Sequence, residues 1–514
     1  VKGLLSGTQQ ILSFIQEEWM LLLFLSILFF LYFHYTNTFD FFEKKGVTFM
    51  EPTFLLGNMG SRLRAKKSMH DFQLEIYDHF RGKPYGGMFE GRRPILYIFD
   101  PDILKAIIIR DFDHFVDRNS LNSREPNYLR RSLLNLKGQE WKAVRSILTP
   151  AFSSARLKNM LPLIQLCTNQ LVEYLGQFDK NDVEMKDTMG HFTLEVIGAC
   201  AFDIKCDALS DDNTYFIKVA SNFNKMSKLK RAMIFSLLIF FPQAIKYLNI
   251  TFLNRESTDE LVRLLKAAKT ERKDSGTKKN DFLQLLIDAA ETEAMEEKNT
   301  HAKVHMDDDT VDAQALLFLI AGYETSSTLL SFAIHVLATR PDLQEKLRQH
   351  IQELSEGKEL DYDLLSQMTY LDGFLMETLR MYPPVARVDR VCTKKYILPG
   401  STVEINVGDI VAIPISGIHM DPQIYPEPHE FRPERFMGEE KRNRPSHLFL
   451  AFGGGPRNCI GLRFAMISAK MSMVALLQNF KFSVCDKTVQ PIAFSKREFL
   501  LKAEKGVWVR IEAL

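Results

Sequence analysis

The stretch that decides the fold reads FGGGPRNCIG and spans Phe452–Gly461. It ends a glycine-rich loop with one cysteine, Cys459, and the apolar run from Leu462 to about Leu477 predicts a helix directly after it. A thiolate sulfur suits haem iron, glycines let the backbone pass close to a flat macrocycle, and amides at a helix N-terminus favour the anionic sulfur. A lone cysteine is more often a buried core residue, but the complete pattern F-x-x-G-x-R-x-C-x-G favours a ligand here.

Composition excludes several other classes of protein. The chain has 514 residues and a formal net charge of +1, whereas nucleic-acid binders usually carry a large basic excess. We find no internal repeat and no long linker, which favours one large folded body. The six cysteines form no C-x-x-C pair, so a structural zinc site is not expected and a reducing compartment is.

The N-terminal segment reads as a membrane anchor. No charged residue occurs from Trp19 to Phe39, which is about the length that spans a bilayer, and basic residues follow at Lys44 and Lys45. We therefore expect an uncleaved anchor over residues 1–36 and a cytosolic catalytic body over residues 37–514. A cleaved signal peptide and a hydrophobic core helix are the alternatives.

The body reads as mostly helical with small β-sheets placed early and late. Strands are expected at residues 95–99, 403–407 and 410–413, and helical periodicity dominates from Pro101 onward. The apolar stretch 233–253 is either a core helix or a second membrane contact. Residues 266–279 are charge-rich, which predicts a solvated helix end and loop.

A long apolar helix is expected from Asp307 to Thr339, ended by Pro341. Within it lies the sequence AGYET, residues 321–325. A glycine and an acid inside an apolar helix are costly enough to need a reason, and Thr325 can bond back to the carbonyl of Ala321 and loosen the helix. Taken alone, the segment is also compatible with an ordinary polar notch in a buried helix.

Other paired residues are ambiguous by themselves. Glu377 and Arg380 lie three apart on one helical face, which usually means a surface salt bridge. Trp141 and Arg145 lie four apart, which usually means an amphipathic surface. The H-x-x-x-H pair at 301 and 305 lacks the glutamate of H-E-x-x-H and reads as a solvated linker.

Together these motifs, in this order along the whole chain, resemble the cytochromes P-450, the haem-thiolate monooxygenases, and most of all insect members of the microsomal, xenobiotic-metabolising branch. The resemblance implies a fold that holds haem b between the long central helix and the cysteine-loop helix. Cys459 is then the axial iron ligand and Phe452 packs near its sulfur. The other implied haem contacts, mostly to the propionates, are Arg118, Trp141, Ala321, Arg145, Arg390 and Arg457.

The resemblance also implies roles and partners. Thr325 holds a water that delivers protons to dioxygen, and Glu324 relays them. Glu377, Arg380 and Arg435 form a buried network that holds the segment before the haem loop. NADPH supplies electrons through a cytochrome P-450 reductase, with cytochrome b5 as a further candidate partner, at the endoplasmic reticulum membrane; the candidate docking charges are Lys137, Lys142, Arg463 and Lys470.

The implied substrate is a lipophilic small molecule, either a xenobiotic or an endogenous lipid or hormone. A haem-thiolate isomerase and a non-enzymatic haem sensor are the rival classes. One departure from the family concerns the segment after the anchor, where several prolines are common and only Pro52 occurs here.

Overall fold

The computed structural model describes residues 2–119, 127–209, 254–276, 279, 281–300, 305–356 and 358–514, with a few isolated positions between 210 and 253. The apolar stretch 233–253 therefore lies almost wholly outside the described residues, and so does His301.

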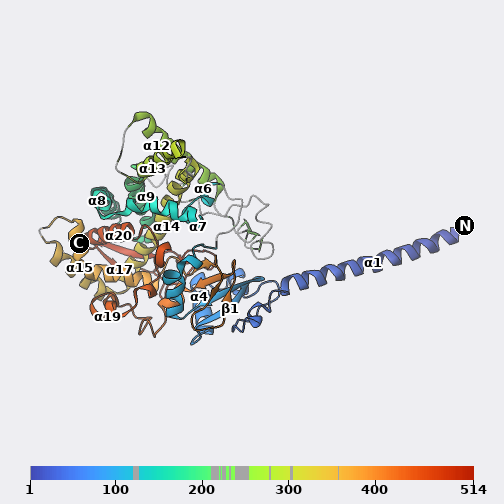
Figure 1. The fold of residues 1–514 in the computed structure, drawn as a ribbon. Coiled ribbons are helices and arrows are strands. Elements are labelled where there is room, and N and C mark those ends of the chain that lie inside the picture. Colours follow the sequence, from blue (N-terminus) through green and yellow to red (C-terminus); the bar gives the residue numbers. More distant parts are fainter. Residues whose placement is uncertain are drawn as a thin grey trace.

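The first helix, α1 (Lys2–Thr36), projects from the body as a single rod (Figure 1). Its apolar side chains from Trp19 to Phe33 are almost all exposed, and the stretch Trp19–Thr36 is long and apolar enough to cross a membrane. One other helix in the described part of the chain, α14 (Asp308–Thr339), passes the same test of length and composition, but half of its apolar window is buried in the protein.

The remaining helices and helical turns of the described chain follow in order: α2 (Phe41–Lys44), α3 (Gly60–Leu63), α4 (Met69–His79), α5 (Pro101–Lys105), η1 (Ala106–Arg110), η2 (Phe112–His114), α6 (Asn127–Arg130), α7 (Gly138–Leu148), η3 (Thr149–Phe152), α8 (Ser154–Gly176), α9 (Met185–Ile197), η4 (Gly198–Phe202), α12 (Arg255–Ser275), α13 (Phe282–Thr300), α15 (Pro341–Ser355), α16 (Tyr362–Gln367), α17 (Thr369–Met381), α18 (Ile415–His419), η6 (Pro433–Phe436), α19 (Gly438–Asn443), η7 (Ser446–Leu448), η8 (Gly455–Arg457) and α20 (Leu462–Asn479).

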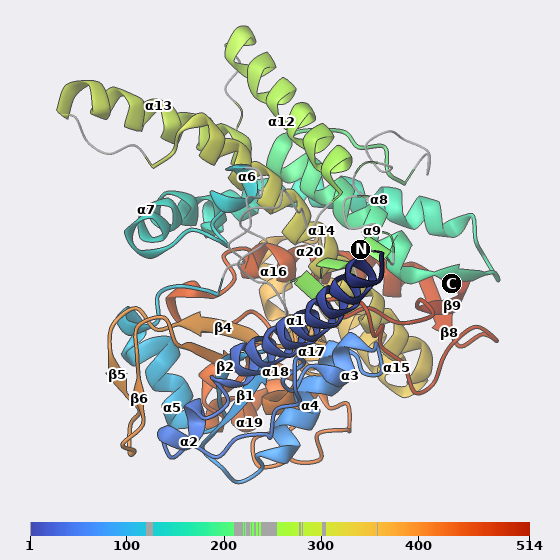
Figure 2. The same ribbon diagram turned by 90° about the vertical axis from the view of Figure 1, so that its right-hand side faces the viewer.

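The strands are β1 (Tyr85–Glu90), β2 (Arg93–Ile98), β3 (Asp182–Glu184), β4 (Val388–Val391), β5 (Tyr396–Ile397), β6 (Glu404–Ile405), β7 (Ile410–Ile413), β8 (Phe480–Ser483) and β9 (Trp508–Ala513). They form a four-stranded sheet in the order β1-β2-β7-β4, a three-stranded sheet β3-β9-β8 and a pair β5-β6. In the larger sheet β2 and β7 run parallel, with Leu96 opposite Val411. Figure 2 shows α6, α7, α8, α12 and α13 in the upper half of the body and this sheet in the lower half, where α4, α5 and α18 lie beside it. The expected class, mostly α with small sheets early and late, is confirmed.

Helix α14 organises the interior. Its N-cap Asp307 accepts a hydrogen bond from the amide of Thr310, and Pro341 opens the next helix, so both predicted ends are confirmed. The first half of α14 belongs to an apolar cluster with α7, α12 and α13, and its second half to another with α8, α17 and α20. Residues 321–325 lie between the two clusters and are only partly covered.

Two expectations need correction. The strand expected at 403–407 is only β6, two residues long. The segment 266–279 is not simply solvated, because Lys269 and Arg272 are buried and paired with Asp312 and Asp281. Those carboxylates lie on or beside packed helices, where an unpaired charge is costly, so the charge pattern marks an interface.

Candidate functional site

The cysteine loop packs tightly on the turn η1. Gly453 and Gly455 have φ angles of 70° and 66°, a region that favours glycine. A Cβ on Gly455 would lie 1.7 Å from the carbonyl oxygen of Ile108, so only glycine fits there. The amide of Cys459 donates to the carbonyl of Phe452 at 2.7 Å, which closes the loop. Gly455 is therefore required by the neighbouring backbone, and not only by access to a flat ligand.

The sulfur of Cys459 faces a large cavity just before α20 begins. Burial raises the pKa of the Cys459 thiol, while the amides of Gly461 and Leu462 and the charges of Arg145 and Arg118 oppose that rise. Because burial is the largest effect, the protein alone does not favour a free thiolate. A bound metal cation would favour it, since a coordinating thiol loses its proton.

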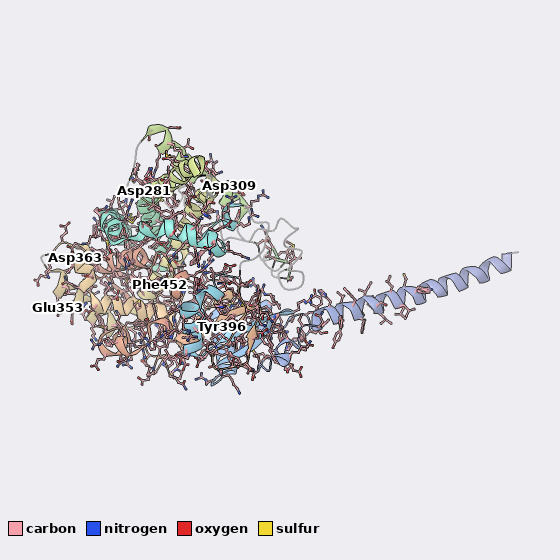
Figure 3. The ribbon with its side chains drawn as sticks, in the orientation of Figure 1. Asp281, Asp309, Glu353, Asp363, Tyr396 and Phe452 are labelled. Atoms are coloured by element: carbon pink, nitrogen blue, oxygen red, sulfur yellow. The ribbon has the colours of Figure 1, made fainter. Side chains whose placement is uncertain are left out.

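The cavity has a volume of about 2550 Å³. A pocket for one drug-sized ligand is roughly 300–1,000 Å³, so there is room for a cofactor as well as a substrate. Cys459 and Phe452, from the loop before α20, line the cavity together with Ala321, Glu324 and Thr325 of α14. Phe452, labelled in Figure 3, is partly buried and packs against the apolar cluster that includes α8, α17 and α20. Cys459 and Glu324, which are 135 positions apart in the sequence, thus line the same cavity.

Arginines gather beside the cysteine. The Arg457 guanidinium stacks on the Trp141 ring at 4.4 Å and donates to the carbonyl of Leu136 at 2.6 Å. Arg118 donates to the carbonyl of Arg457 at 2.9 Å, and Arg145 to the carbonyl of Asn458 at 2.9 Å. These contacts fix the cationic side chains to the same loop that carries the sulfur.

The arginines carry more positive charge than the surrounding protein balances. Burial, together with the charge of Arg118, lowers the pKa values of Arg390 and Arg457 to about 9. The Nε atoms of Arg118, Arg390 and Arg457 are buried without a hydrogen-bond partner, and the carboxylate nearest Arg457, that of Asp117, is 4.0 Å away. An anion with several acceptor oxygens would satisfy these donors. The two propionates of haem supply that chemistry, so the residues present fit the group.

Of the expected haem contacts, Arg118, Trp141, Ala321, Arg145 and Arg457 line the cavity. Arg390 is not among the lining residues. It is 1% exposed and donates to the carbonyl of Asp389, and burial together with the nearby charge of Arg118 lowers its pKa. A contact of Arg390 with a haem propionate therefore stays a prediction.

The acid Glu324 and the alcohol Thr325 line the cavity from α14. The hydroxyl of Thr325 donates to the carbonyl of Ala321 at 2.7 Å, as the sequence predicts. The Glu324 carboxylate pairs with the Lys186 ammonium at 3.3 Å, and Lys186 also donates to Ser327 Oγ at 2.5 Å. Burial lowers the pKa of Lys186, and the charge of Glu324 partly offsets this.

Sequence reasoning missed Lys186, which lies in α9, 138 residues before Glu324. No spacing rule links the two positions. The neighbouring glycine has a packing reason too, because a Cβ on Gly322 would lie 2.6 Å from the Ile197 side chain of α9. The glycine thus lets α9 approach α14 and bring Lys186 to the acid.

A buried network braces the segment before the cysteine loop. The Glu377 carboxylate accepts from Arg380 at 2.7 and 2.8 Å and from Arg435 at 3.3 Å, and all three side chains are at most 1% exposed. The predicted network is confirmed. Arg380 also donates to the carbonyl of His419, and His419 accepts at Nε2 from the amide of Leu450 at 2.8 Å. The brace therefore ends two residues before the loop.

Of the four residues predicted to supply docking charge, Lys470 is wrong. Lys470 is 8% exposed and is held by Asp372 and the carbonyl of Leu365, so it cannot contribute to a surface. Lys137, Lys142 and Arg463 are exposed. Within the described residues no three His, Cys, Asp or Glu side chains gather to hold a metal ion.

A soft sulfur, unbalanced arginines and a large cavity with an acid–alcohol wall define a haem-thiolate protein. Comparison with known proteins agrees. The family profile "Cytochrome P450" matches residues 48–510. Cytochrome P450 9e2 of Blattella germanica is 38% identical over 92% of this chain and 94% of its own, and cytochrome P450 3A6 of Oryctolagus cuniculus is 35% identical over 97% and 98%. Cytochrome P450 6a8 of Drosophila melanogaster is 34% identical over 92% and 95%. The chain belongs to the cytochrome P-450 family, whose members are monooxygenases that use haem with an axial cysteine thiolate.

Proposed function

We propose that the protein inserts one oxygen atom of dioxygen into lipophilic foreign compounds, such as insecticides and plant toxins. Cys459 is the axial ligand of the haem. The observation that carries the proposal is that Cys459, from the loop before α20, and Glu324 and Thr325, from α14, line the same cavity. When bound, the haem supplies the chemistry that activates dioxygen.

The chain's own residues have separate tasks in this proposal. Arg457 and Arg118 hold the propionates and so orient the cofactor. Thr325, whose hydroxyl bonds to the carbonyl of Ala321 within the continuous helix α14, positions a water beside the site of dioxygen binding. Glu324 passes protons to that water, and Lys186 fixes the direction of the Glu324 carboxylate.

Aromatic side chains support the substrate class. The rings of Phe282 and Phe318 are 3.9 Å apart and those of Phe152 and Phe318 are 5.4 Å apart, and all three residues line the cavity. Such a wall binds apolar, ring-containing molecules by burial and ring contacts.

Electrons come from NADPH through a cytochrome P-450 reductase, with cytochrome b5 as a second donor. Lys137, Lys142 and Arg463, exposed near the cysteine side, supply docking charge. Residues 1–36 anchor the catalytic domain, residues 37–514, to the cytosolic face of the endoplasmic reticulum. Deleting residues 1–36 should move most of the protein from the membrane to the soluble fraction, and complete retention on the membrane would contradict the role of the anchor.

The test of the activity uses the full-length, haem-loaded protein with reductase, NADPH and a panel of lipophilic compounds. Thr325→Ala should keep the haem but lower product per NADPH by about tenfold or more, with peroxide rising, because positioned proton transfer contributes roughly 10²–10⁴ in rate.

Thr328→Ala is the matched control. Thr328 makes the same kind of bond, to the carbonyl of Glu324 at 2.8 Å, but it is buried and does not line the cavity. The product formed per NADPH by Thr328→Ala should stay at the wild-type value. Equal coupling in wild type and Thr325→Ala would remove the proposed role.

A further inference from the structure

Gln314, in the first half of α14, makes contacts that the chemistry above does not use. Its side chain is fully buried. Its carbonyl oxygen accepts from the amide of Leu133 at 2.8 Å, and its amide nitrogen donates to the carbonyl of Arg131 at 2.7 Å. One side-chain amide thus pairs with both polar groups of a passing backbone, as a neighbouring strand would.

The backbone that Gln314 holds is the irregular segment 131–136, between α6 and α7. Leu133, Leu134 and Leu136 line the cavity. The carbonyls of Leu134 and Leu136 accept from Arg457 at 3.4 and 2.6 Å. The segment therefore forms part of the cavity wall and also holds the arginine that faces the propionates.

A second tether joins the segment to α14. Arg131 pairs with Asp307, the N-cap of the helix. Both side chains are partly exposed, 34% and 46%, and exposed ion pairs contribute little because water screens them. The Gln314 side chain is fully buried, so losing its hydrogen bonds would leave the amide of Leu133 and the carbonyl of Arg131 without their partner. Of the two tethers, Gln314 is the stronger.

We propose that Gln314 is a positioning residue that sets the length of ligand the cavity accepts, by holding segment 131–136 against α14. This rests on the proposed function, in which the cavity is the substrate site. Without the clamp the segment moves away from α14, the cavity lengthens on that side, and Arg457 loses its fixed acceptors.

The chain contains a matched control for this proposal. Gln344 is also buried, and its amide pairs with backbone in the same way, accepting from the amide of Phe482 at 2.9 Å and donating to the carbonyls of Phe482 at 2.8 Å and Leu337 at 3.0 Å. Gln344 does not line the cavity, and neither do its backbone partners Leu337 and Phe482. Gln344→Met therefore reports the cost of losing such a clamp elsewhere.

Two measurements on the full-length, haem-loaded protein test the proposal. In Gln314→Met, hydrogen exchange at the amide of Leu133 should become at least about tenfold faster, because its acceptor is gone, while the second half of α14 stays protected. Binding of n-alkylimidazoles from butyl to dodecyl, read from the haem absorption band, should shift by several-fold in favour of the longer chains. Gln344→Met should change neither, although its melting temperature should fall.

Gln314→Asn, which keeps an amide but withdraws it by one methylene, gives the same readouts if Gln314→Met does not fold. Unchanged exchange at Leu133, or an unchanged chain-length preference, would overturn the proposal, and so would an equal shift in Gln344→Met. Because imidazole binding needs no turnover, failure of the monooxygenase reaction with reductase would count against the proposed function alone.

Discussion

Two groups of buried arginines lie near the cysteine loop, and they differ in what balances their charge. Arg380 and Arg435 share the carboxylate of Glu377 at hydrogen-bond distance. Arg118 and Arg457 instead bond to backbone carbonyls, and their Nε atoms have no partner. The first group is complete within the protein, whereas the second is complete only with an added anion.

The difference separates folding from cofactor binding. A buried charge that loses its partner costs several kcal/mol, whereas replacing an unpaired buried charge by an apolar side chain can stabilise a fold. The two groups should therefore respond in opposite ways to similar substitutions in the haem-free protein. Each prediction below probes that contrast, starting with the largest effect.

Glu377→Ala should have the largest effect. It would leave Arg380 and Arg435 buried without a carboxylate, at a cost of about 3–5 kcal/mol, which is a large part of the stability of a typical domain. We expect little or no folded, haem-containing protein on expression, measured by absorbance and by gel filtration. Glu439→Ala, an exposed acid in α19, is the control and should express normally. A wild-type yield of Glu377→Ala would show that the brace is dispensable.

Arg457→Met and Arg380→Met should have different effects on the stability of the haem-free protein. Arg457→Met removes an unbalanced charge, so the haem-free protein should melt at or above the wild-type temperature while haem is released roughly tenfold faster or more. Arg380→Met leaves Glu377 partly unpaired, so the melting temperature of the haem-free protein should fall and haem should also be released faster. The measurements are calorimetry of the haem-free protein and haem transfer to an acceptor globin. If both variants lower the melting temperature equally, the contrast between the two groups is wrong.

His419, which connects the brace to Leu450, should make stability depend on pH. Burial first, and then the charge of Arg380, lower its pKa to about 3, compared with about 6.5 in the unfolded chain. The folded state thus favours neutral His419. The contribution of His419 to the free energy of unfolding is full above pH 6.5 and is lost as the pH falls toward 3. The loss is about 2 kcal/mol by pH 5.

His419→Asn tests this smaller effect. The variant should be less stable near neutral pH, because it cannot make both hydrogen bonds of the ring, from the amide of Leu450 to Nε2 and from Nδ1 to the carbonyl of Arg380. Its stability should fall less steeply between pH 6.5 and 5 in urea titrations. His70 and His335, whose pKa values burial also lowers, to about 4, contribute equally to both proteins. Parallel pH profiles for wild type and variant would contradict the assignment.

Local patterns in the sequence predicted the elements that depend on neighbours in the chain. The cysteine loop is one short motif, and the ends of α14 follow from its cap at Asp307 and from Pro341. The bond from Thr325 to Ala321 is four residues long and follows from helix geometry. Such features need no knowledge of the rest of the fold.

Contacts between distant segments were not predictable in the same way. Lys186 meets Glu324 across 138 residues, and Gln314 meets Leu133 across 181. A lysine or a glutamine is common on helices, so neither residue stands out until the helices are packed. The same limit explains Lys269 and Lys470, which were predicted to be solvated because their partners, Asp312 and Asp372, lie far away in the sequence.

The central claim is that Cys459 binds the haem iron as a thiolate, and the spectrum of the reduced protein with carbon monoxide tests it most directly. The full-length, haem-loaded protein should show the red-shifted band of thiolate ligation, and Cys459→His should retain haem but lose that band. Cys485→Ser, a change at a cysteine outside the cavity, should leave the band in place. Absence of the band from fully loaded wild-type protein, or its survival in Cys459→His, would contradict the account.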